Sequence, residues 1–274
     1  MITITSSQMA AVSADVGRWF LRRFPAGSAS YQAVLDAMAS DARLGDAGQL
    51  MRMVGTDQSV TEVDAVVGMK HYFCAGSIVV KNDVAVSGDL RVAGSIQASG
   101  SIVAGDCIQA SGSIQASGSI QAGDSIQTGD SIVAGGSVVA RGFIEAGTSI
   151  QAMGSIQAIR FIEAGTSIQA GISIEAGEYI RASRSISASD SIQASRSISA
   201  GDSIQADDSI QSGESIRAGD SIRAGSIWAA LFIEAGTSID AGSIKVAGPI
   251  GAGTYIRASG PIDAEGLFTF RSPK

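Results

Sequence analysis

The chain contains one histidine, His71, and histidine is the side chain that most often serves as a general base near neutral pH. A serine nucleophile needs such a base within hydrogen-bonding reach. Serine is abundant, but His71 is the one residue of this type that could activate it, and it lies where a non-repetitive N-terminal segment joins a long repeat. We interpret His71 as a boundary residue that is hydrogen-bonded locally, and we predict no catalytic residues.

A pair of carboxylates offers a second kind of chemistry. Glu145 and Glu163 are eighteen residues apart, and Arg181 follows after another eighteen. If this spacing places them in neighbouring turns of one structure, the carboxylates repel each other and Arg181 offsets the repulsion. An exposed column of this kind has no pocket to hold a substrate. We therefore expect a charged surface and no enzyme.

Aspartates, glycines and cysteines suggest cofactor or metal sites that the spacing does not support. Calcium-binding glycine-rich repeats have a nine-residue period with a fixed aspartate, whereas the period here is six and the aspartate varies. Phosphate loops need a strand, a loop and a helix in succession. Cys74 and Cys107 have neither metal spacing nor a disulfide pattern. We predict no cofactor, no metal and reduced thiols. The aspartates concerned are Asp124, Asp130, Asp202 and Asp220.

Composition limits the class of protein. Of 274 residues, 34 are glycine and 4 are proline, aromatics make up 5% and charged residues 16%, and the net charge is −7. Too few bulky side chains are present for a large globular core, and the absence of a basic stripe argues against nucleic-acid binding. No apolar run reaches the roughly 18 residues that a transmembrane helix needs. Met1–Thr5 lacks the features of a secretory signal, so we expect a cytoplasmic protein.

A six-residue repeat explains this composition. Isoleucine or another apolar residue recurs every six residues from Val60 onward, typically in the unit Ser-Ile-Gln-Ala-Gly-Asp. In a strand, Ile and the Ala two places later point inward while Ser and Gln point outward, and the small residues that follow form a corner. Three such sides predict a mainly β fold: a triangular, single-stranded β-helix with about 18 residues in each of about 12 coils.

Two details support the three-sided coil. Phe143, Phe161 and Tyr179 break the serine pattern at intervals of eighteen residues. Two spacings shorten from six to five, at Ile222–Ile227 and Ile239–Ile244, and they are seventeen residues apart. Both shortenings therefore fall at the same corner of consecutive coils.

The N-terminal segment reads differently from the repeat. Apolar residues at helical spacing predict three short helices, at about residues 6–20, 30–41 and 45–54, which form a small helical head. Its core is thin, so it should lean on its neighbour. We assign the head to residues 1–59, the solenoid to 60–270 and a tail to 271–274.

The repeat resembles two families. One is the left-handed hexapeptide β-helix of bacterial acyltransferases, in which Gly follows the aliphatic residue; here Gln, Glu or Arg follows. The hydrophobic-x-Ala rhythm of Ile96-Gln97-Ala98 and Ile102-Val103-Ala104 is more similar to the bactofilins. These are polymer-forming bacterial cytoskeletal proteins with a right-handed triangular solenoid. That resemblance implies assembly into filaments, while the hand of the coil stays open between the two families.

Most outward positions carry Ser or Gln, and we expect the stacked Gln amides to stabilise the coils. A few outward positions carry apolar residues instead. Such residues either stack on one another and stiffen the solenoid, or form a patch for lateral association or a partner. The candidate interaction surface comprises Phe143, Ile159, Phe161, Tyr179, Trp228, Leu231 and Phe232. The candidate end-to-end contact comprises Leu267, Phe268 and Phe270.

Three functions are consistent with these features. The first is a non-enzymatic structural or scaffolding solenoid that self-associates into a homo-oligomer or filament, with residues 1–59 as a cap or as an adaptor for a protein partner. The second is a binding module or inhibitor that presents a rigid acidic rod and mimics duplex DNA, as pentapeptide-repeat proteins do. The third is a hexapeptide-repeat acyltransferase, which would depend on His71.

Overall fold

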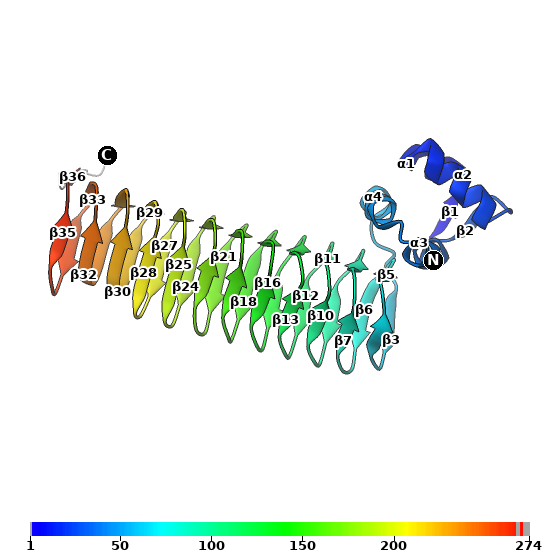
Figure 1. Ribbon diagram of the computed structural model, residues 1–274, viewed down its shortest axis with the longest axis horizontal. Helices are drawn as coiled ribbons and strands as arrows, with labels where there is room; N and C mark the ends of the chain where they lie inside the picture. The colour runs from blue at the N-terminus through cyan, green and yellow to red at the C-terminus, as the bar shows by residue number, and fades with distance from the viewer. Residues whose placement is uncertain (1, 267–268, 271–274) are drawn as a thin grey trace. The chain divides into compact units, whose positions relative to one another are not determined.

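The computed structural model describes residues 2–266 and 269–270. It is mainly β: a parallel β-solenoid of about 11 turns, with coils of about 18 residues, follows a small N-terminal helical region (Figure 1). The chain divides into two compact units, Met1–Asp130 and Ser131–Lys274. The fold class expected from the repeat is confirmed.

The first unit begins with a helical head of four helices and one short antiparallel strand pair. The helices are α1 (Ser6–Val12), α2 (Ala14–Arg23), α3 (Tyr31–Ser40) and α4 (Leu44–Val54), and the strands are β1 (Thr3–Thr5) and β2 (Ser28–Ser30). Four helices form where three were expected because Ser13 is extended (φ −166°) and its side chain accepts the N–H of Val16. Ser13 thereby ends α1 and caps α2. Thr5 caps α1, in a capping box with Gln8.

The head shares its apolar core with the first coils of the same unit. Phe20, Tyr31 and Met38 are buried in one cluster that also contains Phe73 and Ala75 of the solenoid. A head of this size buries too little apolar surface to be stable alone, so the coil beneath it completes the core.

Each coil has three strands, which we call sides A, B and C in chain order. In the first unit, side A consists of β3 (Val60–Val63), β6 (Ser77–Val80), β9 (Ile96–Ala98) and β12 (Ile114–Ala116). Side B consists of β4 (Val66–Met69), β7 (Val84–Val86), β10 (Ile102–Ala104) and β13 (Ile120–Ala122). Side C consists of β5 (Tyr72–Cys74), β8 (Leu90–Val92), β11 (Ile108–Ala110) and β14 (Ile126–Thr128).

The second unit continues the same three-strand order. Side A consists of β15 (Ile132–Ala134), β18 (Ser149–Ala152), β21 (Ser167–Ala170), β24 (Ser185–Ala188), β27 (Ser203–Ala206), the first parts of β30 (Ser221–Ala229) and β32 (Ser238–Val246), and β34 (Tyr255–Ala258). Side B consists of β16 (Val138–Ala140), β19 (Ile156–Ala158), β22 (Ile174–Ala176), β25 (Ser191–Ala194), β28 (Ser209–Ser212), the second parts of β30 and β32, and β35 (Ile262–Ala264). Side C consists of β17 (Ile144–Ala146), β20 (Ile162–Ala164), β23 (Ile180–Ala182), β26 (Ile198–Ala200), β29 (Ser215–Ala218), β31 (Phe232–Ala235), β33 (Ile250–Ala252) and β36 (Thr269–Phe270).

Strands of one side pair in parallel with the same side of the next coil. Ile102 lies opposite Ile120 in the first unit, and Ile150 lies opposite Ile168 in the second. The isoleucines and the alanines two places later are buried, while the residue between them faces outward. The core is therefore a column of Ile and a column of Ala on each side, as the hexad predicted.

The two shortened spacings lie at one corner, as predicted. Both β30 and β32 run through the corner between sides A and B as single nine-residue strands, and Ile222 and Ile227 pair with Ile239 and Ile244. Gly225 and Gly242 are each the single residue of this corner in their coils, where the other coils of the second unit use two residues.

The prediction that Val60 is the first inward-facing residue of the repeat was wrong. Val60 lies opposite Ser77, and Thr61 lies opposite Ile78, so Val60 points outward and is 59% exposed. Thr61 and Val66 are five positions apart instead of six, which is a third shortening of the A–B corner. A strict six-residue step across this corner placed the first strand one residue too early.

Candidate interaction surfaces

Three aromatic side chains form a ladder on the second unit. The ring centroids of Phe143 and Phe161 are 4.9 Å apart with planes 6° from parallel, and those of Phe161 and Tyr179 are 5.0 Å apart with planes at 1°. All three residues directly precede a side C strand, and successive coils stack at the strand spacing of about 4.8 Å. Each ring therefore covers a face of the next, and all three side chains are half-buried.

Charged groups flank this ladder. The hydroxyl of Tyr179 donates a hydrogen bond to Glu163 Oε2 at 3.2 Å, and burial raises the pKa of Tyr179. The guanidinium carbons of Arg160 and Arg181 lie 5.6 and 5.8 Å from the ring centres of Phe161 and Tyr179. The Phe161 ring is thus covered within the chain by Phe143 and Tyr179, and Arg160 and Arg181 lie against the ladder.

Three other members of the candidate surface form a separate group. Leu231 is exposed at the corner before side C, Phe232 begins the side C strand that follows it, and Trp228 is exposed on side B, whereas Ile159 is exposed beside the ladder, at the corner before Phe161 several coils earlier. Arg217 lies 5.1 Å from the ring centre of Phe232. The two groups are separated along the corner by Glu178, Arg196 and Glu214. The seven residues thus do not form one continuous apolar patch.

Exposed apolar side chains that the sequence analysis did not single out include two at neighbouring corners of the second unit. Met153 and Ile172 are exposed at the A–B corner of consecutive coils. Both stand where Ser, Gly or Asp is usual, so the departure from the repeat was a visible signal.

Ion pairs link consecutive coils of the second unit. Arginine and carboxylate side chains one coil apart approach within 3.2–3.4 Å in the pairs Arg160–Glu178, Arg184–Asp202, Arg196–Glu214 and Arg217–Glu234. Glu163 likewise lies opposite Arg181 in the strand register. A continuous negative surface would need columns of unpaired carboxylates, and these arginines neutralise the carboxylates of several such columns.

His71 is part of a hydrogen-bond chain in the first unit. Its Nδ1 accepts the backbone N–H of Asp89 at 3.0 Å, and the buried Asp89 carboxylate accepts bonds from Arg91 at 3.0 Å and from the N–H of Cys107 at 3.1 Å. The imidazole thus links two consecutive coils by a hydrogen bond. A cleft of about 460 Å³ next to it is lined by Asp36, Ala39, Ser40, Ala42, Met69, Lys70, His71, Tyr72 and Phe73.

Serine also pairs coils. The hydroxyl of Ser95 accepts the N–H of Ser113 at 3.1 Å, and that of Ser77 accepts the N–H of Ser95 at 3.0 Å. Ser101 and Ser137 accept the N–H groups of Ser119 and Ser155 in the same way, so serine before a strand can satisfy a backbone donor of the next coil.

The two cysteines are free thiols. Cys74 is buried and Cys107 half-buried, and burial raises the pKa of both. Among the described residues, no group of three or more His, Cys, Asp or Glu side chains could hold a metal ion. No helix in that part of the chain is long and apolar enough to cross a membrane.

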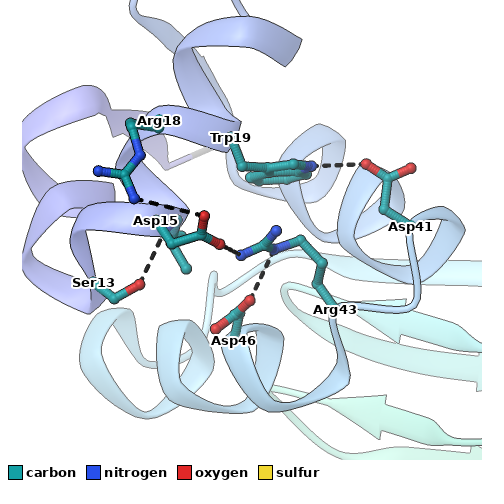
Figure 2. A network of polar contacts seen from close by, with 8 residues as sticks. Ser13, Asp15, Arg18, Trp19, Asp41, Arg43 and Asp46 are labelled. Carbon is teal, nitrogen blue, oxygen red and sulfur yellow. Dashed lines mark hydrogen bonds and ion pairs between the residues drawn. The ribbon is translucent and has the colours of Figure 1, made fainter.

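The head is fixed internally by a polar network around Arg43 (Figure 2). The Arg43 guanidinium pairs with Asp15 at 2.6 Å and with Asp46 at 2.8 Å, and it lies 5.3 Å from the ring centre of Trp19. Trp19 Nε1 donates to Asp41 Oδ2 at 2.7 Å. The Arg43 hydrogen bond holds the pKa of Asp15 below its usual value. These contacts join α2, α4 and the loop before α4.

The head meets the first coil through Gln32 of α3. Gln32 Nε2 donates to the carbonyl of Phe73 at 2.8 Å, and Gln32 Oε1 accepts the N–H of Ala75 at 2.9 Å. The amide thus occupies the edge of β5 that faces away from β8. This contact was not predicted, because a single polar residue in a helix carries no periodic signal.

The outer edges of β3 and β4 in the first coil carry features that oppose strand pairing. Val60, Val67 and Met69 are 59%, 56% and 47% exposed, but Gly68 (φ +74°) forms a bulge that shifts the register between Val67 and Met69. Lys81 and Asp64 form an exposed ion pair beside it at 2.9 Å. Bulges and charges at an edge discourage the addition of another strand.

The last described coil differs. Ile262 of β35 is 39% exposed, although the equivalent Ile244 of the coil below is buried, and Tyr255 of β34, which lies opposite Ser238 in the register, is 46% exposed. Strands β34 and β35 each pair on one edge with β32, and no strand of residues 2–266 and 269–270 pairs with the other edge. Of the candidate end-to-end contact, Leu267 and Phe268 lie outside the described residues, and Phe270 lies in β36, which pairs with β33.

Comparison with known proteins identifies the head alone. Residues 1–54 match the family model described as the YdhT N-terminal domain. Neither a curated protein nor a solved structure matches the chain.

Proposed function

We propose that this chain is a non-enzymatic structural protein of the cytoplasm whose β-solenoid associates with further copies of itself. The observation that carries the proposal is the outer edge of β34 and β35. It combines backbone groups without a described strand partner with the exposed apolar side chains of Tyr255 and Ile262. Such an edge is a template for another strand.

The head supports the same proposal from the first coil. Gln32 occupies the edge of β5, and the bulge at Gly68 disturbs the edge of β4. We therefore assign the head a capping role, which directs association to the other edge.

Sedimentation velocity of the full chain over a hundredfold range of concentration tests this function. Association appears as a sedimentation coefficient that rises with concentration. A strict monomer at every concentration contradicts the proposal.

Recruitment of a protein partner by the head is a second candidate. Capture of the same protein by the full chain and loss of that protein when residues 1–59 are deleted would support this role. The acidic, DNA-like rod is less favoured, since Arg160, Arg184, Arg196 and Arg217 neutralise neighbouring carboxylates.

A further inference from the structure

The outer edge of the last described coil carries two opposite charges. Arg257 is the third residue of β34 on side A, between Ile256 and Ala258, and Asp263 is the central residue of β35 on side B. Both are exposed, and neither forms an ion pair with another described residue. Arg257 follows Asp240 in the strand register and Asp263 follows Lys245.

Oppositely charged residues follow each other in both columns near this end. On side A the order is Arg223, Asp240, Arg257, and on side B Lys245 precedes Asp263. The next layer that preserves this alternation must place an acid over Arg257 and a base over Asp263. The same coil contains both groups, so a second copy of it can supply them.

A two-fold axis perpendicular to the solenoid achieves this when it passes through side C. The axis turns side A of one copy onto side B of the other, and the facing strands run antiparallel. Axes through side A or side B would instead place Arg257 on Arg257 or Asp263 on Asp263, and like charges directly opposite are destabilising.

We infer that two copies of this chain pair through the outer edges of β34 and β35 about such an axis, with Arg257 of each copy opposite Asp263 of the other. This inference rests on the proposed self-association and specifies its surface. A two-fold interface of this kind is self-complementary and closed.

The inward residues fit the same register. With Arg257 opposite Asp263, Ile256 lies opposite Ala264 of the second copy, and Ala258 lies opposite Ile262. Each large side chain then faces a small one, and the part-exposed Ile256 and Ile262 become covered. Alternation of large and small residues lets facing layers interdigitate.

The competing arrangement is head-to-tail stacking, in which the last described coil covers β3 and β4 of another copy. It would place Arg257 over Glu62, but Asp263 would meet the apolar Val67 beside the Gly68 bulge. It would also bring side C against the helical head, which occupies the edge of β5 through Gln32.

Charge reversal in the full chain distinguishes these arrangements. Arg257→Asp and Asp263→Arg should each weaken association about tenfold, because each places two pairs of like charges in the interface. The double variant Arg257→Asp/Asp263→Arg should restore the wild-type affinity. Glu62→Arg is the matched control and should leave it unchanged. Sedimentation equilibrium gives the dissociation constants, and unchanged thermal unfolding verifies that each variant is folded.

Cysteine cross-linking tests the register itself. Oxidation of an equimolar mixture of Arg257→Cys and Asp263→Cys should give a covalent dimer, because opposite residues of antiparallel strands lie within disulfide range. Either variant alone should not, and this also controls for the native Cys74 and Cys107.

Each result decides one point. A wild-type chain that associates but is insensitive to both reversals, or is not restored in the double variant, overturns the two-fold register and leaves self-association intact. Weakening by Glu62→Arg indicates head-to-tail stacking and also overturns the register. A wild-type chain that stays monomeric overturns the self-association on which the inference rests.

Discussion

The side-chain amide of Gln32 stands in for a β-strand at Ala75. It accepts the Ala75 N–H at 2.9 Å and donates to the neighbouring Phe73 carbonyl at 2.8 Å, which are the bonds that a preceding coil would make. A stacked solenoid leaves an open strand edge at its first coil, and Gln32 of the helical head occupies this edge at β5. The head and the first coil therefore form one folded unit.

Replacing Gln32 with alanine should destabilise the first unit by about 2 kcal/mol, because two backbone groups near buried Ala75 lose their partners. Hydrogen exchange at the Ala75 amide should accelerate, and urea unfolding measures the loss of stability. Gln49→Ala is the matched control, since its single bond to Val12 O is 3.4 Å long. Equal effects of both variants would contradict the strand-like role of Gln32.

Tyr72 should make the first unit sensitive to alkali. Burial raises its pKa from 10.0 to about 12, so the fold favours the neutral phenol. The stability that this provides is complete below pH 10 and is lost as the pH rises toward 12, because only the unfolded chain ionises in that range. Stability measured by urea unfolding should decline less steeply over this interval in Tyr72→Phe. An identical decline in both proteins would argue against this assignment.

Asp57 should make the same unit sensitive to acid. Its carboxylate accepts the backbone N–H of Ile2 at 3.0 Å and that of Ser59 at 3.1 Å, and the first of these bonds is the main reason why its pKa lies below 3.8. The stabilisation is present above that value and disappears as the pH falls through the lowered pKa. Asp57→Asn should reduce stability at pH 7 and flatten the dependence below pH 4, as followed by circular dichroism. A full acid transition in the variant would count against this role.

The aromatic ladder should contribute to stability through its central ring. Phe161→Ala removes both stacking contacts, at 4.9 and 5.0 Å, and should cost about 2–3 kcal/mol together with the lost burial. Ile159→Ser, at the exposed corner nearby, should change stability by less than about 0.5 kcal/mol. Thermal unfolding of the two variants separates a stiffening ladder from a docking patch. A larger effect of Ile159→Ser would reverse that assignment.

The period of the repeat was sufficient to predict the coil, because each Ile and Ala has one role wherever it recurs. The shared corner of the short spacings at Gly225 and Gly242 followed from the same reasoning. Val60 was misplaced because the terminal coil contains its own short corner, and at an open end neither Val60 nor Thr61 is buried enough to mark the inward position.

The surfaces were harder to predict than the core. Six residues per side place Phe143, Phe161 and Tyr179 in one column, and they do stack. Whether an outward residue is exposed or covered depends on its neighbours one coil away, as the contrast between half-buried Phe161 and exposed Ile159 shows. Gln32 lies outside the repeat, so periodicity could not indicate its partner.

The narrow corners at Gly225 and Gly242 interrupt the regular stacking of the A–B corner, because each has one residue where the coils on either side have two. At the first boundary, the backbone N–H groups of Gly225 and Ser226 donate to the carbonyls of Asp207 and Asp208, which form a two-residue corner in the preceding coil. At the second boundary, the two-residue corner returns with Ser259 and Gly260, and the N–H of Gly260 donates to the carbonyl of Gly242. Around this stretch the mismatch occurs at its two boundaries, while the layers between them match each other. A further narrow coil inserted between them would create no new mismatched boundary. Insertion or loss of a coil inside the narrow stretch should therefore cost little stability.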